Sequence, residues 1–492
     1  MCIYAEKNTT HIQPHNMKFL LFMVAFLCLQ FSNAQNNFSE KEKQTDAVAK
    51  QLIYYFNYKK QDSAYMLASE TFKKNINESS WQSIFNKQII NLLPFSNLEF
   101  KSSKNGILKY KMQGVVPFQL LISTDSLQKF VVFAIQPYQE DARKKQLAAT
   151  DNSKESLLDK TVDSLASNYI NTEGNVALSI AVYANGKDYF YNYGETKKDN
   201  KQLPTNKTLY EIGSITKTFT GILLAQAIVE KKVKLTDPII QFLPDSVAKN
   251  KGLNGITLAH LSNHSSGLPR IPINMNFTVT NYLQPYENYD DKALFWFLKN
   301  YRDTAKPGSK YDYSNLAVGL LGTILERIYK KPFDVLLKEK IMTPLTLNST
   351  KIKLSAEEKN WITQGYNEKG EEVPVWNFKS LAACGALKSN TTDLLQYGKY
   401  QLPSFTSSIH KSIQLSHLPT FTSATEKVGL GWIYLSNDNS NIIHHSGGTY
   451  GCRSLIAINK NKNVVVVVLT NNATNGDALG IRLFKSIDSI TQ

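Results

Sequence analysis

The chain has 492 residues, more than one ordinary hydrophobic core supports, so its length predicts two domains. Hydrophobic residues make up 42% and charged residues 20%, values typical of globular proteins that exclude wholesale disorder. The formal net charge is +15, but the lysines are scattered and no basic stretch carries the aromatic interleaving or groove-reading motif that nucleic acid requires. We therefore expect no nucleic-acid partner, and a solvated basic surface is the simplest interpretation of the charge.

The first 34 residues have the pattern of a signal peptide. Lys18 precedes an apolar run over residues 19–29, and residues 32–34, Ser-Asn-Ala, offer the small side chains that a signal peptidase reads. We expect cleavage before Gln35 and a periplasmic or extracellular protein. The apolar run is too short to span a bilayer comfortably, so no stable membrane anchor is expected. Met17 is an alternative start to Met1.

Two cysteines remain after such a cleavage, Cys384 and Cys452. An exported chain can pair them as a disulfide. Two free, buried thiols are equally compatible with the sequence, so the pattern leaves both states open.

Residues 35–138 predict a small α+β accessory domain. Apolar spacing indicates three helices and then three short strands, at 47–56, 64–72, 81–93, 106–112, 115–123 and 129–135. This order of elements is similar to that of nuclear-transport-factor-like modules. The segment carries no catalytic cluster. Residues 139–155 are polar and charged, which is typical of a linker.

Residues 156–492 predict a second and larger domain that begins with a helix over 156–170. Two strand-like runs then flank Asn185-Gly186, the strongest short signal for a β-hairpin. Further helices are expected from Thr257 to the glycine and proline turn at 267–269, over 316–329 and over 478–487. The run 464–469, five valines and a leucine, predicts a buried central strand.

Ser214 and Lys217 stand three residues apart, just before an apolar run over residues 219–229. If Ser214 opens a helix, Lys217 lies one turn later on the same face, with its amine within reach of the serine hydroxyl. A serine hydroxyl needs a neighbour to take its proton and donors to hold the oxyanion that its attack creates. The same spacing recurs where no comparable buried helix follows, at Ser126/Lys129, Ser246/Lys249 and Ser408/Lys411.

His260 and His264 lie four residues apart, as a pair of metal ligands on a helix would. The glutamate of a His-Glu-x-x-His site is missing and no third ligand is evident. We therefore predict no metal and no cofactor, and a histidine that holds a turn together.

Polar groups gather at two further places. Tyr313 and Asn315 stand at a turn directly before an apolar helix, a position that favours a cleft. Near the C-terminus, His444 and His445 precede Ser446-Gly447-Gly448, and only one of the two histidines can face the cleft because strand side chains alternate. The two glycines allow close approach of a substrate or another backbone.

Three motifs in this order, Ser214-Ile-Thr-Lys217, Tyr313-Ser-Asn315 and His445-Ser-Gly447, resemble those of the serine β-lactamase and penicillin-binding superfamily. The Tyr-x-Asn form is similar to that of the class C-like branch, which also includes D-alanyl-D-alanine carboxypeptidases, esterases and D-amino-acid peptidases. The resemblance covers residue 156 to the C-terminus. It implies an α+β fold, a β-lactamase-like α/β sandwich in which helices flank an antiparallel sheet beside an all-helical region.

The resemblance also implies a role for each motif residue. Ser214 is expected to be the acylated nucleophile, Lys217 its proton partner, and Tyr313 a general base or acid. Asn315 is expected to position the substrate amide. The backbone N–H groups of Ser214 and Gly448 are expected to form the oxyanion hole.

One departure concerns the third motif, which usually begins with a lysine that binds a substrate carboxylate and here begins with His445. A histidine is largely neutral near pH 7, so this clamp should be weaker, and Arg453 is a candidate to compensate. His445, Gly447 and Gly448 are nonetheless expected to contact the substrate.

We expect an exported serine hydrolase that works through an acyl-enzyme on small-molecule or peptide substrates. These include D-amino-acid peptides, β-lactams, small esters and fragments of peptidoglycan. The alternative is a catalytically weak, penicillin-binding-like module that binds or senses the cell wall.

Overall fold

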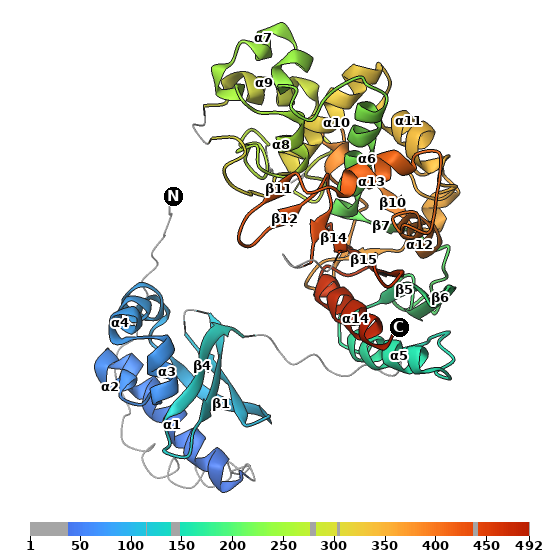
Figure 1. Ribbon diagram of the computed structural model, residues 1–492. Helices are drawn as coiled ribbons and strands as arrows, with labels where there is room; N and C mark the ends of the chain where they lie inside the picture. Colours follow the sequence, from blue (N-terminus) through green and yellow to red (C-terminus); the bar gives the residue numbers. More distant parts are fainter. Residues whose placement is uncertain are drawn as a thin grey trace, which may run out of the picture. The chain divides into compact units, whose positions relative to one another are not determined.

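The computed structural model describes residues 38–114, 116–138, 148–275, 282–302, 306–435 and 441–491. The chain forms two compact units, Met1–Asp141 and Ala142–Gln492 (Figure 1). The predicted signal peptide lies outside the described residues, as does most of the predicted linker. Within the described ranges, no helix combines the length and the apolar character that crossing a membrane requires.

The N-terminal unit packs short helices against a four-stranded antiparallel sheet of order β1-β2-β3-β4. Its elements are α1 (Glu40–Asn57), α2 (Gln61–Tyr65), α3 (Glu70–Asn75), α4 (Glu78–Lys87), the 3-10 turn η1 (Ile89–Leu92), β1 (Ser96–Lys104), β2 (Ile107–Gln113), β3 (Pro117–Thr124) and β4 (Phe130–Pro137). Ser39 begins α1 with a capping box, because its hydroxyl accepts from the Glu42 backbone while the Glu42 side chain accepts from the Ser39 backbone. Trp81 is buried among aromatic rings, including Phe56 and Phe130.

The sequence predicted this unit only in part. One predicted helix, 64–72, is two helices, because Ser69 caps α3 with its hydroxyl and so starts a new helix. The predicted helix 81–93 is α4 followed by η1. Strand β1 is absent from the prediction, since its side chains are exposed or half-buried and give no alternation of buried and exposed positions.

The C-terminal unit is built on an eight-stranded antiparallel sheet of order β11-β12-β13-β14-β15-β16-β5-β6. Its strands are β5 (Ala177–Ala184), β6 (Lys187–Gly194), β11 (Phe421–Thr422), β12 (Lys427–Val428), β13 (Ile433–Tyr434), β14 (Ile442–Gly448), β15 (Arg453–Asn459) and β16 (Val464–Thr470). Asn185 and Gly186 both have positive φ, 51° and 79°, as a tight hairpin turn between β5 and β6 requires. All seven residues of β16 are buried, as the valine run predicts.

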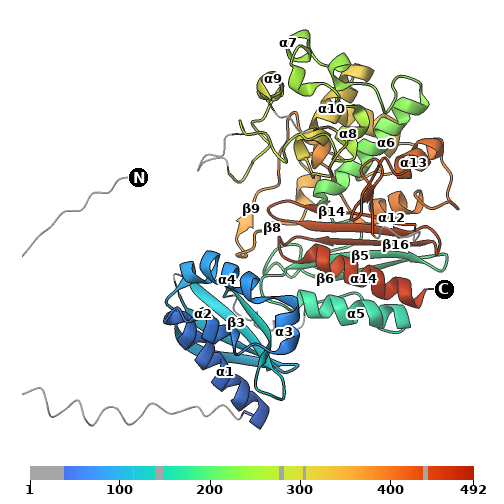
Figure 2. The same ribbon diagram turned by 60° about the vertical axis from the view of Figure 1, so that its left-hand side comes forward.

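Helices cover both faces of this sheet (Figure 2). Helices α5 (Leu157–Ile170) and α14 (Gly476–Ile490) pack together on one face, and α12 (Thr391–Lys399) packs on the other against β5 and β16. The remaining α-helices form the helical region: α6 (Thr216–Val229), α7 (Asp245–Ala248), α8 (Leu258–Ser262), α9 (Asp291–Asn300), α10 (Asn315–Tyr329), α11 (Phe333–Leu337) and α13 (His410–His417).

Shorter elements connect these layers: β7 (Tyr210–Glu211), β8 (Gly365–Tyr366), β9 (Glu372–Val373), β10 (Lys388–Ser389), the π-turn η5 (Lys338–Met342), and the 3-10 turns η2 (Gly213–Ile215), η3 (Ile239–Phe242), η4 (Lys251–Leu253), η6 (Glu358–Asn360) and η7 (Ala382–Cys384). Strand β7 pairs with β10, and β8 pairs with β9. The predicted fold class, an antiparallel sheet flanked by helices beside a helical region, is confirmed.

Candidate active site

Ser214 lies in the 3-10 turn η2, which runs directly into α6. The helix therefore starts two residues later than predicted, at Thr216, but the tightened turn keeps Ser214 and Lys217 on one face. Helix α6 is apolar on nearly all sides and passes through the core, where Phe219 stacks on Tyr397 with ring centroids 4.0 Å apart. The sequence of α6 thus fixes its first turn rigidly in the interior.

Lys217 is buried, with 1% of its surface exposed, and its amine has three oxygen partners. Its Nζ donates to Ser214 Oγ at 2.9 Å, to Asn315 Oδ1 at 2.8 Å and to the Cys384 carbonyl at 2.7 Å. These three acceptors account for the three donors of an ammonium group. Within the described ranges, no carboxylate lies within ion-pairing distance of this amine.

Tyr313 and Asn315 are placed by the start of α10. Ser314 caps that helix, because its hydroxyl accepts from the Ala317 backbone and donates to the Pro269 carbonyl. The Tyr313 ring lies beside Lys217, with the Lys217 Nζ 4.8 Å from the ring centroid. The serine, lysine, tyrosine and asparagine predicted from separate motifs are therefore brought together.

Two residues of the loop after α8, His264 and Arg270, contact the Tyr313 ring. His264 adopts a left-handed backbone, φ 64°, and its Nδ1 accepts from the Ser314 backbone, so it holds a turn as predicted. Its ring lies 4.3 Å from the Tyr313 ring. The guanidinium of Arg270 lies over the Tyr313 ring at 4.9 Å from the centroid.

Strand β14 forms the opposite wall. His445 faces the cavity and His444 does not, in agreement with the alternation of strand side chains. A side chain at Gly447 would overlap the Ile212 carbonyl, and one at Gly213 would lie 2.7 Å from the Gly448 nitrogen. Glycine at these positions therefore lets β14 touch the segment that carries Ser214.

The outer edge of β14 is open where it passes Ser214. Strand β13 pairs only with His444 and Ile443, so in the described part of the chain residues 445–448 pair with β15 alone. Residues 445–448 line the cavity, and the Ser446 carbonyl is already engaged by His445 Nδ1 at 2.6 Å.

These residues line a single cavity of about 620 Å³. Of the predicted site residues, the lining includes Ser214, Tyr313, Asn315, His445, Gly447 and Gly448. Lys217 is not part of the lining and is connected to it by its hydrogen bond to Ser214.

Burial and charge keep the histidines of this site neutral. Burial, together with the nearby Lys217 charge, lowers the pKa of His445 to about 3. The same two causes lower the pKa of His264 well below its usual value. The Nε2 atoms of both rings are buried and have no hydrogen-bond partner in the described structure. His445 therefore adds no positive charge at neutral pH where a lysine would.

Two residues of the site escaped the sequence analysis. Tyr286 lines the cavity and its hydroxyl accepts from Asn315 Nδ2 at 2.9 Å. Trp376 also lines it, and its backbone N–H donates to the buried Glu211 carboxylate. No local pattern marks them, because each reaches the site only through long-range packing.

The remaining sequence candidates have other positions. His260 Nδ1 accepts from the Thr257 backbone in a capping box at α8. No group of three His, Cys, Asp or Glu side chains in the described ranges is arranged to hold a metal. Cys384 and Cys452 are both free and buried, so of the two states left open by the sequence the structure has the free thiols.

Comparison with known proteins agrees with this fold. The sequence model of the family described as Beta-lactamase matches residues 162–484. The chain is 29% identical over 275 residues to a β-lactamase of Pseudomonas fluorescens, covering 56% of this chain and 73% of that one. It is 28% identical over 329 residues to a β-lactamase of Escherichia coli K12, covering 60% and 83%.

Solved structures show the same fold. A β-lactamase/D-alanine carboxypeptidase from Pseudomonas syringae superposes with a TM-score of 0.60 at 24% identity, over 68% of this chain and all of that one. A class C β-lactamase superposes with a TM-score of 0.62 at 24% identity, over 70% and 99%. The chain belongs to the β-lactamase family of serine hydrolases.

Proposed function

We propose that this protein is an exported serine hydrolase that acylates Ser214 and cleaves amide or ester bonds. The observation that carries the proposal is the 2.9 Å bond between Lys217 Nζ and Ser214 Oγ at the wall of a cavity that also contains Tyr313. A buried amine beside a hydroxyl and a phenol is a proton-handling group placed at a nucleophile.

In the first step, Ser214 Oγ attacks the acyl carbon and its proton passes to the Lys217 and Tyr313 pair. The oxygen of the acyl group becomes an oxyanion that the backbone N–H groups of Ser214 and Gly448 receive. The bond to the amine or alcohol then breaks, and the leaving group takes the proton. A water molecule attacks the acyl-enzyme in the same way, releasing the acid and restoring the Ser214 hydroxyl.

Asn315 and the open edge of β14 orient the substrate. Asn315 Oδ1 accepts from Lys217 and its Nδ2 donates to Tyr286, so the amide has one fixed orientation at the cavity wall. Backbone groups of residues 445–448 pair with a peptide-like substrate, for which D-amino-acid peptides and β-lactams are the expected classes.

Arg453 supplies the charge that His445 lacks. Its Nη1 donates to the Thr449 and Cys452 carbonyls, which fixes the guanidinium beside Gly448. The rest of the planar fork is then available for a substrate carboxylate at the end of the cavity. We expect a tolerance for esters and amides without a carboxylate, because this cation stands on β15 and not at the start of the third motif.

The decisive experiment is covalent labelling. The protein is incubated with a fluorophosphonate and with a labelled penicillin, and peptide mass spectrometry is expected to locate the adduct on Ser214. Ser214→Ala should abolish both the adduct and the turnover of a p-nitrophenyl ester. Ser246→Ala is the matched control, because Ser246 has the same spacing to Lys249 but is exposed and outside the cavity.

The second candidate function is a binding or sensing module with weak turnover, favoured by the neutral His445. Labelling of Ser214 without turnover of any ester, β-lactam or D-Ala-D-Ala peptide would support this function. In either case we propose that residues 35–138 are an accessory domain. We also propose that residues 1–34 are removed on export, and mass spectrometry of the secreted protein tests this removal directly.

A further inference from the structure

The oxyanion hole proposed above needs two backbone N–H groups that come from different segments of the chain, those of Ser214 and Gly448. Directly after β14, the Thr449 N–H donates to the Cys452 carbonyl at 3.0 Å and so continues the pairing of β14 with β15. Successive residues of an antiparallel strand direct their backbone groups to opposite sides. The Gly448 N–H therefore points away from β15, and Gly448 lines the cavity at Ser214.

The segment that carries Ser214 contacts Gly448 directly. A side chain built on Gly213 would lie 2.7 Å from the Gly448 nitrogen. The Ser454 hydroxyl of β15 donates to the Ile212 carbonyl at 2.9 Å, which holds this segment against the sheet. The distance between the two N–H groups is therefore set by the hydrogen bonds that join this segment to β15, to β14 and to the turn after β14.

Glu211 makes a second connection between the same two segments. It stands three residues before Ser214, only 4% of its surface is exposed, and its Oε2 accepts from the Thr449 hydroxyl at 2.9 Å. Thr449 follows Gly448 directly in the chain. The other oxygen, Oε1, accepts from the Trp376 N–H at 2.7 Å, and Trp376 also lines the cavity. One buried carboxylate thus holds the residue next to Gly448 and a residue of the cavity wall.

The Thr449 hydroxyl needs an acceptor, and the Glu211 carboxylate supplies it. The hydroxyl oxygen accepts from the backbone N–H groups of Gly451 and Cys452, at 3.3 and 3.1 Å. A hydroxyl has two lone pairs and one proton, so the proton is the part that still needs a partner. The three bonds together fix the turn that follows Gly448, and with it the direction of the Gly448 N–H.

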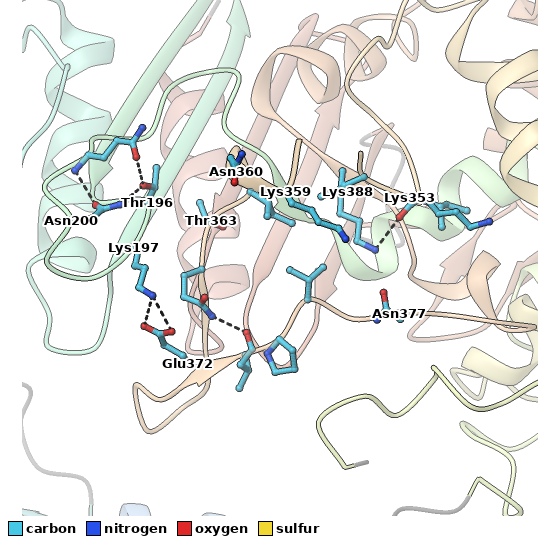
Figure 3. Close-up of a pocket in the computed structure, with 18 of the residues that line it drawn as sticks. Thr196, Lys197, Asn200, Lys353, Lys359, Asn360, Thr363, Glu372, Asn377 and Lys388 are labelled. Atoms are coloured by element: carbon cyan, nitrogen blue, oxygen red, sulfur yellow. Dashed lines mark hydrogen bonds and ion pairs between the residues drawn. The ribbon is translucent and has the colours of Figure 1, made fainter. Parts of the chain in front are cut away.

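Lys388 offsets the charge of Glu211 from outside the cavity at Ser214. The two residues are partners in the β7–β10 pair, and the Lys388 amine also donates to two backbone carbonyls, at 3.1 and 3.0 Å. Figure 3 shows Lys388 at the wall of a second cavity, of about 990 Å³, which is not the one at Ser214. Both Glu211 oxygens are thus left to the Thr449 hydroxyl and the Trp376 N–H.

We propose that Glu211 and Thr449 are positioning residues of the oxyanion hole, and that their hydrogen bond sets the distance between the Ser214 and Gly448 N–H groups. The inference rests on the proposed acylation of Ser214. Both side chains act through the backbone, because the Thr449 hydroxyl is already bonded to Glu211 and to its own turn. Loss of this bond should weaken binding of the tetrahedral intermediate more than binding of the substrate, because the oxyanion forms only in the reaction.

The test compares Thr449→Val, which removes the hydroxyl and keeps the shape, with Thr449→Ser, which keeps the hydroxyl. In Thr449→Val, kcat/KM for a p-nitrophenyl ester should fall about ten-fold, less than the 10²- to 10³-fold typical of losing an oxyanion donor itself. The inhibition constant of phenylboronic acid, which forms a tetrahedral adduct with a serine, should rise by the same factor. Thr449→Ser should stay close to wild type. Glu211→Gln should resemble Thr449→Val, because an amide has one oxygen where the two partners of Glu211 use two.

Thr350→Val is the matched control, because the buried Thr350 hydroxyl donates to the buried Asp393 carboxylate at 2.8 Å outside the cavity at Ser214. It should lower the melting temperature as Thr449→Val does but keep the wild-type kcat/KM. Equal kcat/KM in the two valine variants, or equal losses in Thr449→Ser and Thr449→Val, would overturn this inference alone. Absence of any turnover in the wild type would overturn the proposed function, and this inference with it.

Discussion

Two regions of the C-terminal unit each bury a lysine, and the difference between them separates the proposed catalytic site from a structural one. Lys217 donates to a hydroxyl, an amide oxygen and a carbonyl, with no carboxylate among its described partners. Lys388 donates to two carbonyls and has the buried carboxylate of Glu211 as its electrostatic neighbour. We propose proton transfer for the lysine that contacts the Ser214 hydroxyl, whereas the lysine that faces a buried carboxylate has a structural role.

The two regions are connected through one peptide segment. Trp376 donates its backbone N–H to Glu211 and offers its carbonyl to Lys388. Glu211 also accepts from Thr449, in the loop that follows β14. Glu211 and Lys388 thus connect three segments: the strand that leads to Ser214, the segment that carries Trp376, and the end of β14.

The largest expected effect is the loss of activity in Lys217→Met. Removal of a proton-transfer group typically costs about 10²- to 10⁴-fold, so kcat/KM for a p-nitrophenyl ester should fall by that order. The unfolding free energy should change less than in Lys388→Met, because no unpaired buried anion is left behind. Wild-type kcat/KM in Lys217→Met would remove the amine from the mechanism.

Lys388→Met should have the reverse effect. Glu211 lies opposite Lys388 in the β7–β10 pair, and loss of one of two interacting buried charges costs up to about 3–5 kcal/mol, because the other charge remains buried. Urea unfolding should show this loss, while kcat of the folded fraction should fall far less than in Lys217→Met. Burial raises the pKa of Glu211, and Glu211→Gln should therefore partly restore the stability of Lys388→Met in a double-mutant cycle. Additive losses would mean that the two residues do not form a pair.

The buried histidines should make the unfolding free energy depend on pH. Burial lowers the pKa of His445 and His417 to about 3 and that of His444 to about 4. The unfolded chain binds a proton at each near pH 6.5 and the folded chain does not. The unfolding free energy is therefore highest above pH 6.5. It decreases as the pH falls toward 4, by up to about 1.4 kcal/mol per pH unit for each histidine.

Urea unfolding at pH 7.0, 6.0 and 5.0 measures this slope. His417→Gln should reduce it, because one buried imidazole is removed. A constant unfolding free energy over this range would show that the histidines are accessible to protons.

The sequence predicted the parts of the site whose chemistry is local. Ser214 and Lys217 share one helical turn, and the apolar run of α6 separates them from the other Ser-x-x-Lys pairs. Tyr313 and Asn315 flank Ser314, whose side chain caps the start of α10. These features need no knowledge of the tertiary fold.

The long-range partners could not be predicted in this way. Glu211 and Lys388 meet because β7 pairs with β10, two strands of two residues each, too short to give a periodic signal. Tyr286 has no specific local signal, yet its hydroxyl accepts from Asn315 Nδ2 in the cavity. Such contacts depend on packing between segments far apart in the chain.

The smallest expected effect concerns His445, which stands where the third motif of the resembled superfamily usually has a lysine. His445→Lys would place a second cation near Lys217, and the like-charge repulsion limits the gain. We expect the ratio of kcat/KM for a p-nitrophenyl succinate monoester to that for p-nitrophenyl butyrate to rise about five-fold, the order of one partly exposed ion pair. Arg453→Gln should move the ratio in the opposite direction, whereas Arg270→Gln, which removes a cation from the Tyr313 side of the cavity, should change it less. An unchanged ratio in His445→Lys would mean that the substrate carboxylate does not reach β14, and the assignment of Arg453 would then rest on its own variant alone.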